Sequence, residues 1–239
     1  MTTVKRPIFQ RAAGFIGPED LSEVVMVIIG CGAVGSNLAV IAAKMGFVNF
    51  DLWDPDIVEG HNLPNQAFEP EHISISKVEA LAAVLQRFNP EIKVTIHQEY
   101  YSKETAADAA LVGPVVIATD TMKSRREISE LMTLNPLADH IFEARLGFDY
   151  GEVHIIDNQD LDKINRWQKT FKDDSEIPEG PCNLKICTTL VLSICSFMVH
   201  QICNHYSVKR NSGMWRFYPQ TVFHLNNQTG SFTVKHFGE

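Results

Sequence analysis

The first half of the chain alternates between continuous apolar runs and apolar residues at helical spacing. Val24 to Ile29 is a continuous, mostly β-branched run, which is typical of a strand buried on both faces of a parallel sheet. Residues 36–45 place apolar side chains on one helical face, and residues 47–53, which are mostly apolar and end just before Asp54, are typical of a second strand. This order predicts a strand, a helix and a second strand, which together form a βαβ unit.

The same periodicities predict further elements along the chain. Two runs, 221–225 and 231–236, flank Asn226–Gly230 and predict a C-terminal β-hairpin. The other expected elements are helices at 76–88, 105–111, 123–133 and 188 to about 203, and strands at 92–97, 115–118, 141–144 and 151–156.

Three polar segments interrupt this pattern. Residues 1–23 include the helix breakers Pro7 and Pro18 and are expected to form an N-terminal arm. The segment from 157 to about 182 has only scattered apolar residues, and we expect an irregular, mobile crossover segment there. Residues 207–216 are polar and basic, which predicts a loop.

A glycine motif lies where the first strand meets the first helix. Gly30, Gly32 and Gly35 form G-x-G-x-x-G, with Ala33 inside the loop. Glycines allow the backbone to approach a phosphate, and the helix N-terminus supplies free N–H groups and a positive dipole end. Asp54 ends the second strand, where it can accept hydrogen bonds from ribose hydroxyls. These features predict a nucleotide site and are also compatible with an NAD(P)-dependent oxidoreductase.

The residues after Asp54 favour ATP over NAD. The segment Asp54-Pro-Asp-Ile-Val-Glu-Gly-His-Asn-Leu-Pro-Asn-Gln66 resembles the D-x-D-x-V-x-x-x-N-L-x-R-Q signature of the MoeB/ThiF/HesA family, which includes the ubiquitin-activating enzymes. Lys77 at the start of the next helix, Asn89–Pro90 after it, and Thr119-Asp-Thr-Met-Lys-Ser-Arg125 resemble three further family signatures. The ordered match covers about residues 24–126.

The resemblance implies roles for individual residues toward ATP and Mg²⁺. Asp54 would hold the ribose, Asn62 would orient the phosphate-binding turn, and Lys77 would offset the charge of the triphosphate. Asp120 would hold Mg²⁺, a cation that takes few carboxylates and keeps its waters. The remaining expected nucleotide contacts are Asp56, Asn65, Gln66, Thr119 and Arg125.

This chain departs from the family signature at one cation. Asn65 stands where the family has arginine, so one charge that neutralises phosphate is missing. Candidates to replace it are Arg125, Arg126 and Arg145, although Arg145 could instead pair in the neighbourhood of Glu143. The family also uses an arginine from the N-terminal arm, often the arm of the partner subunit. Arg11 is the closest match here, with Arg6 as the second choice.

The cysteines suggest a reducing setting and one possible acyl acceptor. The five cysteines, Cys31, Cys182, Cys187, Cys195 and Cys203, fit no disulfide framework, which favours a cytoplasmic location. The resemblance makes Cys182, and after it Cys187, the candidates for a thioester with the acyl group. The expected role of Cys195 and Cys203 is packing in a helix. The C-x-x-C pairs that bind zinc in many relatives are absent, and the nine histidines show no metal-ligand spacing, so we predict no structural zinc.

The composition and net charge of the chain limit the classes of partner that it is expected to bind. The chain is 45% apolar and 21% charged, with a formal net charge of -8, so we expect it to bind neither nucleic acid nor an anionic membrane surface. No signal peptide and no membrane-length apolar run is seen.

The expected fold is α/β: a Rossmann-like βαβ nucleotide-binding half that continues into a mixed sheet flanked by helices, with a C-terminal β-hairpin. One ThiF-like adenylation domain would cover residues 1–239, since α/β domains of this length are common. Its parts would be the arm at 1–23, the nucleotide-binding half at 24–135 and the second half at 136–239.

The implied activity is ATP-dependent adenylation of a carboxylate, with an acyl adenylate formed and pyrophosphate released. The implied substrate is the C-terminus of a ubiquitin-like or sulfur-carrier protein, and the implied assembly is a homodimer. The alternatives are the NAD(P)-dependent oxidoreductase and a non-catalytic scaffold that keeps the fold.

Overall fold

One continuous sheet organises the chain. The computed structural model describes residues 21–106, 111–133, 135–147, 150–176, 188–211, 221–226 and 228–236. Within these residues the sheet has eight strands in the order β3-β2-β1-β4-β5-β6-β7-β8. The strands are β1 (Val25–Ile29), β2 (Asn49–Trp53), β3 (Lys93–His97), β4 (Gly113–Ile117), β5 (Ala138–Leu146), β6 (Tyr150–Asp157), β7 (Thr221–Asn226) and β8 (Ser231–His236).

The sheet changes from parallel to antiparallel at β5. Strands β3, β2, β1, β4 and β5 run parallel, whereas β6, β7 and β8 continue from β5 as antiparallel neighbours. The parallel part contains the predicted βαβ unit, and β7 and β8 form the predicted C-terminal hairpin. The prediction of an α/β fold with a mixed sheet is confirmed.

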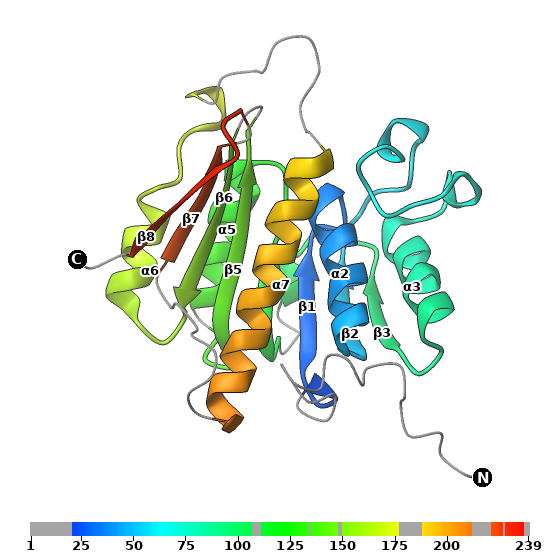
Figure 1. Cartoon of the computed structure of the whole chain (residues 1–239), viewed down its shortest axis with the longest axis horizontal. Coiled ribbons are helices and arrows are strands. Elements are labelled where there is room, and N and C mark those ends of the chain that lie inside the picture. The colour runs from blue at the N-terminus through cyan, green and yellow to red at the C-terminus, as the bar shows by residue number, and fades with distance from the viewer. Residues whose placement is uncertain are drawn as a thin grey trace.

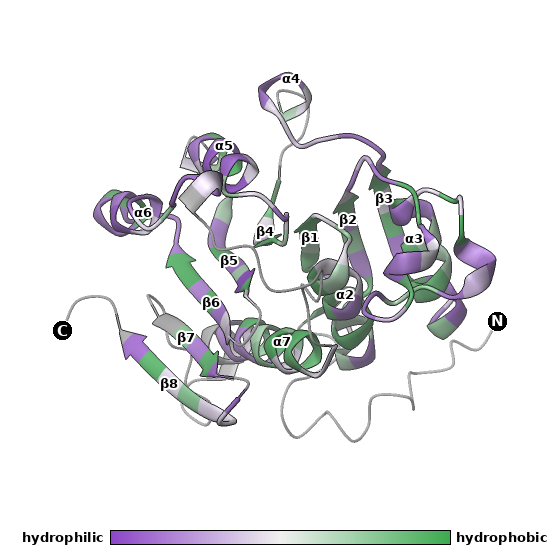
Figure 2. Ribbon diagram, turned by 90° about the horizontal axis from the view of Figure 1, so that it is seen from above, coloured by the Kyte–Doolittle hydropathy of each residue, from purple (hydrophilic) through white to green (hydrophobic). Residues whose placement is uncertain are grey.

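Helices cover both faces of the sheet (Figure 1; Figure 2). Side chains alternate along each strand, so Met26 and Ile28 of β1 join one core while Val27 and Ile29 join the other. The first core is closed by α2 (Ala33–Met45), α3 (Lys77–Phe88) and α7 (Thr188–Asn211), and the second by α5 (Met122–Thr133) and α6 (Leu161–Gln168). Residues Lys103–Ala106 form the short helix α4.

Two predictions about polar segments are wrong in part. Residues 157 to about 182 are not irregular throughout, because they contain α6, whose Ile164 and Trp167 are buried. Asp160 starts this helix by accepting a hydrogen bond from the Lys163 amide at 3.1 Å. The expected loop at 207–216 is also wrong at its beginning, since α7 runs on to Asn211.

Smaller differences concern the ends of elements. The helix expected at 105–111 begins at Lys103, and Leu111 lies outside it. The strand expected at 141–144 extends over all of β5, including the polar residues Asp139 and His140 at its start. No helix within the described ranges is long and apolar enough to cross a membrane.

Candidate nucleotide-binding site

The candidate site lies at the carboxyl ends of β1, β2 and β4. These strands are parallel neighbours, so the segments that follow them meet at one edge of the sheet. The glycine loop follows β1, the segment 54–76 follows β2, and the Thr119–Asp120 turn follows β4. In Figure 1 the segment 54–76 rises above this edge, next to the start of α2.

The glycine loop is folded tightly against its neighbours. Gly30 has φ +97, and its amide donates to the Trp53 carbonyl oxygen at 2.8 Å. A Cβ at Gly30 would lie 2.7 Å from the Ala118 carbonyl oxygen, so the loop touches the chain that leads into the Asp120 turn. A Cβ at Gly35 would lie 1.9 Å from the Gly30 carbonyl oxygen. Both positions therefore require glycine for this loop.

Asp54 joins the glycine loop to the segment after β2. Its Oδ2 accepts the Cys31 amide at 2.6 Å, and its Oδ1 accepts the Asp56 amide at 2.9 Å. Burial raises the pKa of Asp54, while the charge of Lys77 and these two amides oppose that shift. Each carboxylate oxygen can accept a further hydrogen bond, so this anchoring is compatible with the predicted contact to ribose.

Lys77 is held as a buried cation at the same edge. Its Nζ lies 2.7 Å from Asp56 Oδ2 and 4.0 Å from Asp54 Oδ1. Burial opposes its charge, but the hydrogen bond to Asp56 and the charge of Asp54 leave the pKa of Lys77 raised. Ser76 caps α3 through the Glu79 amide at 3.3 Å, so Lys77 lies at the first position of a capped helix.

The residues from Asn62 to Gln66 lie against the start of α2. Asn62 is buried, and its Oδ1 accepts the Glu59 amide at 2.9 Å, which fixes the turn. Asn37 of α2 donates to the Asn65 carbonyl oxygen at 2.8 Å. Among the described residues, the buried Oδ1 of Asn65 and Oε1 of Gln66 have no hydrogen-bond partner. Gln66 Nε2 is also the nearest atom to a Cβ built on Gly32, at 4.0 Å, so these amides lie beside the glycine loop. Buried polar groups of this kind are expected to meet a ligand or water.

Asp120 is an exposed carboxylate in the turn before α5. It could have served as the cap of that helix, but the first amides of α5 are capped by Asp174 instead. Asp174 accepts the Met122 amide at 2.6 Å and the Lys123 amide at 3.1 Å. The Asp120 carboxylate is therefore not used as the helix cap and is accessible to a cation.

A buried cluster of charged side chains contacts the turn that contains Asp120. Glu143 is fully buried and binds Arg125 at 2.8 Å and Arg145 at 2.7 and 2.8 Å, and it accepts the Trp167 Nε1–H at 2.6 Å. Burial alone would raise the pKa of Glu143, but Arg125 and Arg145 outweigh it and lower the pKa to about 2. Arg125 also donates to the Thr119 carbonyl oxygen, which ties the cluster to the Asp120 turn.

The sequence profile of the ThiF family matches residues 5–216. The chain belongs to the ThiF family. Ubiquitin-like modifier-activating enzyme 5 of Bombyx mori is 36% identical over 76 residues, which are 32% of this chain and 19% of that protein. Adenylyltransferase and sulfurtransferase MOCS3-2 of Zea mays is 32% identical over 123 residues, which are 51% of this chain and 26% of that protein. The matches thus span about a fifth to a quarter of these relatives.

Solved structures of low sequence identity share the ThiF fold. The structure of E. coli MccB with ATP has a TM-score of 0.69 and 15% identity, and the likeness covers 93% of this chain and 66% of MccB. E. coli tRNA N6-threonylcarbamoyladenosine dehydratase, TcdA, has a TM-score of 0.68 and 18% identity, over 85% of this chain and 95% of TcdA. The family membership inferred from the signature after Asp54 is confirmed.

The ThiF fold brings most of the predicted site residues to one edge, but two of the proposed replacement cations are engaged elsewhere. Arg125 and Arg145 both bind Glu143, as the alternative for Arg145 anticipated. Arg126 is exposed and donates to the Phe171 carbonyl oxygen at 3.2 Å. A nucleotide contact by Arg125 stays a prediction.

Three of the five cysteines are buried, and the other two lie outside the described residues. Burial raises the pKa of the Cys31 thiol and raises the pKa of Cys195 and Cys203 to about 12, so these three are not available as thiolates. Both candidates for the acyl acceptor, Cys182 and Cys187, lie outside the described residues, as do the two candidates for the arm arginine, Arg6 and Arg11.

Replacing Gly35 with alanine is expected to destabilise this ThiF chain and to abolish nucleotide binding. The new Cβ would overlap the Gly30 carbonyl oxygen, and overpacking of this kind costs roughly 1–3 kcal/mol. Gly60→Ala is the matched control, because a Cβ there meets no atom within 4 Å. Thermal unfolding and ATP titration of both variants measure the effect. Normal ATP binding by Gly35→Ala would contradict the role given to this loop.

Proposed function

We propose that the chain uses ATP to adenylate a carboxylate. The observation that carries the proposal is the convergence of three different groups at one sheet edge. These are the glycine loop packed against Ala118, the buried cation Lys77 held 2.7 Å from Asp56, and the exposed carboxylate Asp120 in the turn that follows Ala118. A hydride-transferring enzyme would have no use for the second and third groups.

The residues present fit ATP and Mg²⁺. The cradle formed by Gly30 and Gly35 has no room for a Cβ, and the free amide oxygens of Asn65 and Gln66 lie beside it. Asp120 would hold Mg²⁺, which would neutralise charge on the phosphates when bound. The N-terminus of α2 points N–H groups and a positive dipole end at the same place.

The chemistry is charge stabilisation and positioning. A carboxylate oxygen of the substrate attacks the α-phosphorus of ATP, the bond from that phosphorus to the bridging oxygen breaks, and pyrophosphate leaves with the electron pair. Lys77 offsets the negative charge that develops, and its ion pairs with the buried Asp54 and the exposed Asp56 keep it charged and fixed. Asp54 and Asn62 hold the two segments that border the nucleotide in place.

We assign the C-terminal carboxylate of a ubiquitin-like or sulfur-carrier protein as the substrate. The names of the relatives support this class, since they include a ubiquitin-like modifier-activating enzyme and an adenylyltransferase and sulfurtransferase. We also assign a cytoplasmic homodimer in which Arg11 of one chain serves the site of the other, with Cys182 as a later acyl acceptor.

The direct test is ATP–pyrophosphate exchange with Mg²⁺ and a panel of carrier proteins that end in a free C-terminal glycine. Exchange that depends on both the chain and one carrier supports the proposal. The same carriers with an amidated C-terminus are the control, because they lack the nucleophile. The proposal fails if the chain neither binds ATP nor exchanges pyrophosphate with any carrier.

Asn65 favours one alternative, a ThiF scaffold that keeps the nucleotide site but has lost turnover. Loss of one well-placed donor typically costs about 10²–10³ in kcat. Replacing Asn65 with arginine is therefore expected to raise the exchange rate about tenfold or more, because it restores a cation next to the glycine loop. Asn65→Gln is the matched control, which adds length without charge. An unchanged rate in Asn65→Arg would show that another group already supplies this charge.

A further inference from the structure

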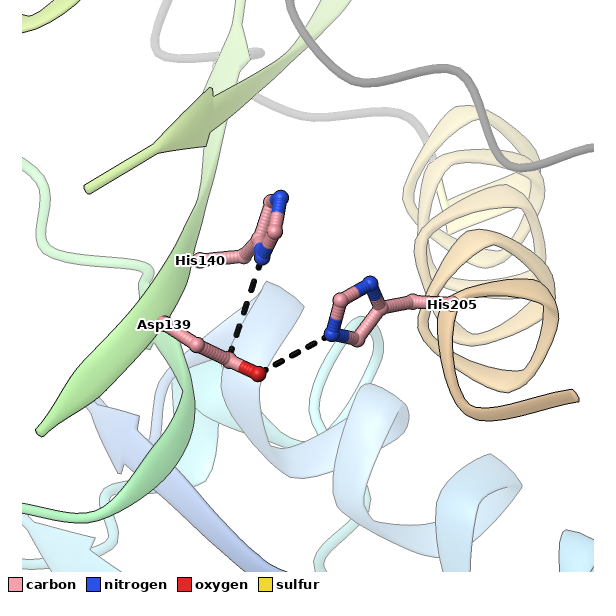
Figure 3. A group of neighbouring side chains, drawn as sticks. All are labelled: Asp139, His140 and His205. Carbon is pink, nitrogen blue, oxygen red and sulfur yellow. Dashed lines mark hydrogen bonds and ion pairs between the residues drawn. The ribbon is translucent and has the colours of Figure 1, made fainter. Parts of the chain in front are cut away.

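Three side chains with metal-binding atoms meet at the opposite end of the sheet from the nucleotide site. Asp139 and His140 lie at the start of β5, and His205 lies in the second half of α7 (Figure 3). One ligand atom from each lies within 4.8 Å of the others. Since β4 and β5 are parallel, the start of β5 is at the amino ends of the strands, whereas Asp120 follows the carboxyl end of β4.

A β-bulge explains how two neighbouring strand residues can serve one site. Gly113 of β4 pairs with Ala138 and Pro114 pairs with His140, so Asp139 is the extra residue on β5. Consecutive residues of a regular strand point to opposite faces, and a bulge redirects them. Figure 3 shows the Asp139 and His140 side chains converging with that of His205 between β5 and α7.

The distances are close to those that a single ion requires. His205 Nε2 lies 3.0 Å from Asp139 Oδ2, and His140 Nδ1 lies 3.9 Å from Asp139 Oδ1. The two imidazole rings have centroids 4.3 Å apart. Ligand atoms about 2.0–2.1 Å from a tetrahedral zinc ion lie roughly 3.4 Å from one another, so binding requires the side chains to rotate and bring ligand atoms that now lie within 4.8 Å of one another to this spacing.

The chemistry and burial of the group favour zinc over a hard cation. Two imidazoles and one carboxylate suit a borderline ion such as Zn²⁺, whereas Mg²⁺ and Ca²⁺ prefer oxygen ligands. His205 is only 5% exposed, while Asp139 is half-buried, so a water molecule can reach the position that three protein ligands leave open.

We propose that Asp139, His140 and His205 bind one zinc ion. The site joins the sheet to α7, across 66 residues of sequence between Asp139 and His205. It replaces the prediction of no zinc, which rested on cysteine pairs and on spacing along the sequence. The ion is separate from the Mg²⁺ proposed at Asp120, and the proposal stands without the adenylation activity.

Zinc binding by the 239-residue chain, prepared without a histidine tag and treated with a chelator, tests this site. The expected result is one tightly bound zinc per chain in a competition titration against a chromophoric chelator, confirmed by elemental analysis after dialysis. Mg²⁺ is expected not to compete. His205→Gln and His140→Gln are each expected to weaken zinc binding by more than the 10–100-fold that loss of an outer-shell partner costs.

Two controls keep the result specific. His200→Gln removes an exposed histidine from the same helix and is expected to keep full zinc binding. Asp120→Ala is expected to keep zinc as well, which separates this site from the nucleotide site. Circular dichroism identifies folded variants, and His140→Gln decides the question if His205→Gln does not fold. The proposal is overturned if the wild-type chain takes up less than one zinc, or if the double variant His140→Gln/His205→Gln binds zinc as tightly as the wild type.

Discussion

Replacing Asp120 with asparagine is expected to reduce the pyrophosphate exchange rate by about 10²–10³-fold or more. The side chain keeps its size but loses the charge that would hold Mg²⁺. Because Asp120 is exposed and Asp174 caps α5, the fold and its thermal stability are expected to stay unchanged. The measurement is exchange at saturating ATP, with a melting curve for each variant.

Asp162→Asn is the matched control for this experiment. Asp162 is also an exposed aspartate, in the first turn of α6, and is expected to have no effect on exchange. Equal exchange by the wild type and Asp120→Asn would remove Asp120 from the mechanism. A loss of exchange together with a lower melting temperature would instead assign Asp120 a structural role.

Replacing Glu143 with alanine is expected to lower the free energy of unfolding by about 3–5 kcal/mol. The fully buried carboxylate balances Arg125 and Arg145, and its removal leaves two cations unpaired beside the core. Chemical denaturation measures the loss. Glu127→Ala, an exposed position on α5, is the control and is expected to change stability by less than about 0.5 kcal/mol. A Glu143→Ala loss as small as that of the control would show that Arg125 and Arg145 reach water.

The same residue gives the stability of the fold a pH dependence of known sign. The pKa of Glu143 is lowered from 4.5 to about 2, so the folded state binds this proton less readily than the unfolded state. The contribution of Glu143 is fully present above about pH 4.5 and is lost as the pH falls toward 2. Glu143→Gln is expected to remove this part of the acid sensitivity, which denaturation curves at several pH values would show.

The parts of the fold that the sequence predicts are those with strong local signals. The βαβ unit combines buried β-branched runs with a glycine motif, and the hairpin flanks a polar turn. Helix α6 was missed because Ile164 and Trp167 are its two buried residues among many polar ones. Helix α7 was ended too early because polar residues such as Asn204 and His205 are buried there by tertiary packing, which overrides local pattern.

In the candidate site, too, some residues could be predicted from local sequence signals and others could not. Lys77 and Asp120 could be found because they follow recognisable segments that end on one sheet edge. The partners of the supporting groups could not, because they are far apart in sequence. Asp174 accepts amides from residues that lie 52 and 51 positions earlier in the sequence. Glu143 accepts a hydrogen bond from Trp167, which lies 24 positions later. Spacing along the sequence could not point to the proposed zinc site, because a bulge, which no spacing rule describes, brings Asp139 and His140 together.

The Asp174 cap makes two distant stretches of chain thermodynamically linked. Asp174, whose carboxylate caps the N-terminus of α5, lies in the segment after α6. Two hydrogen bonds therefore join that segment to the start of α5, directly after the Asp120 turn. Any partner that binds better when residue 174 is displaced must also break the two hydrogen bonds from the Met122 and Lys123 amides of α5, and the reverse holds equally. An N-cap contributes about 0.5–2 kcal/mol to stability. The coupling free energy carried by this contact cannot exceed that value, which corresponds to a change in affinity of roughly 2–30-fold.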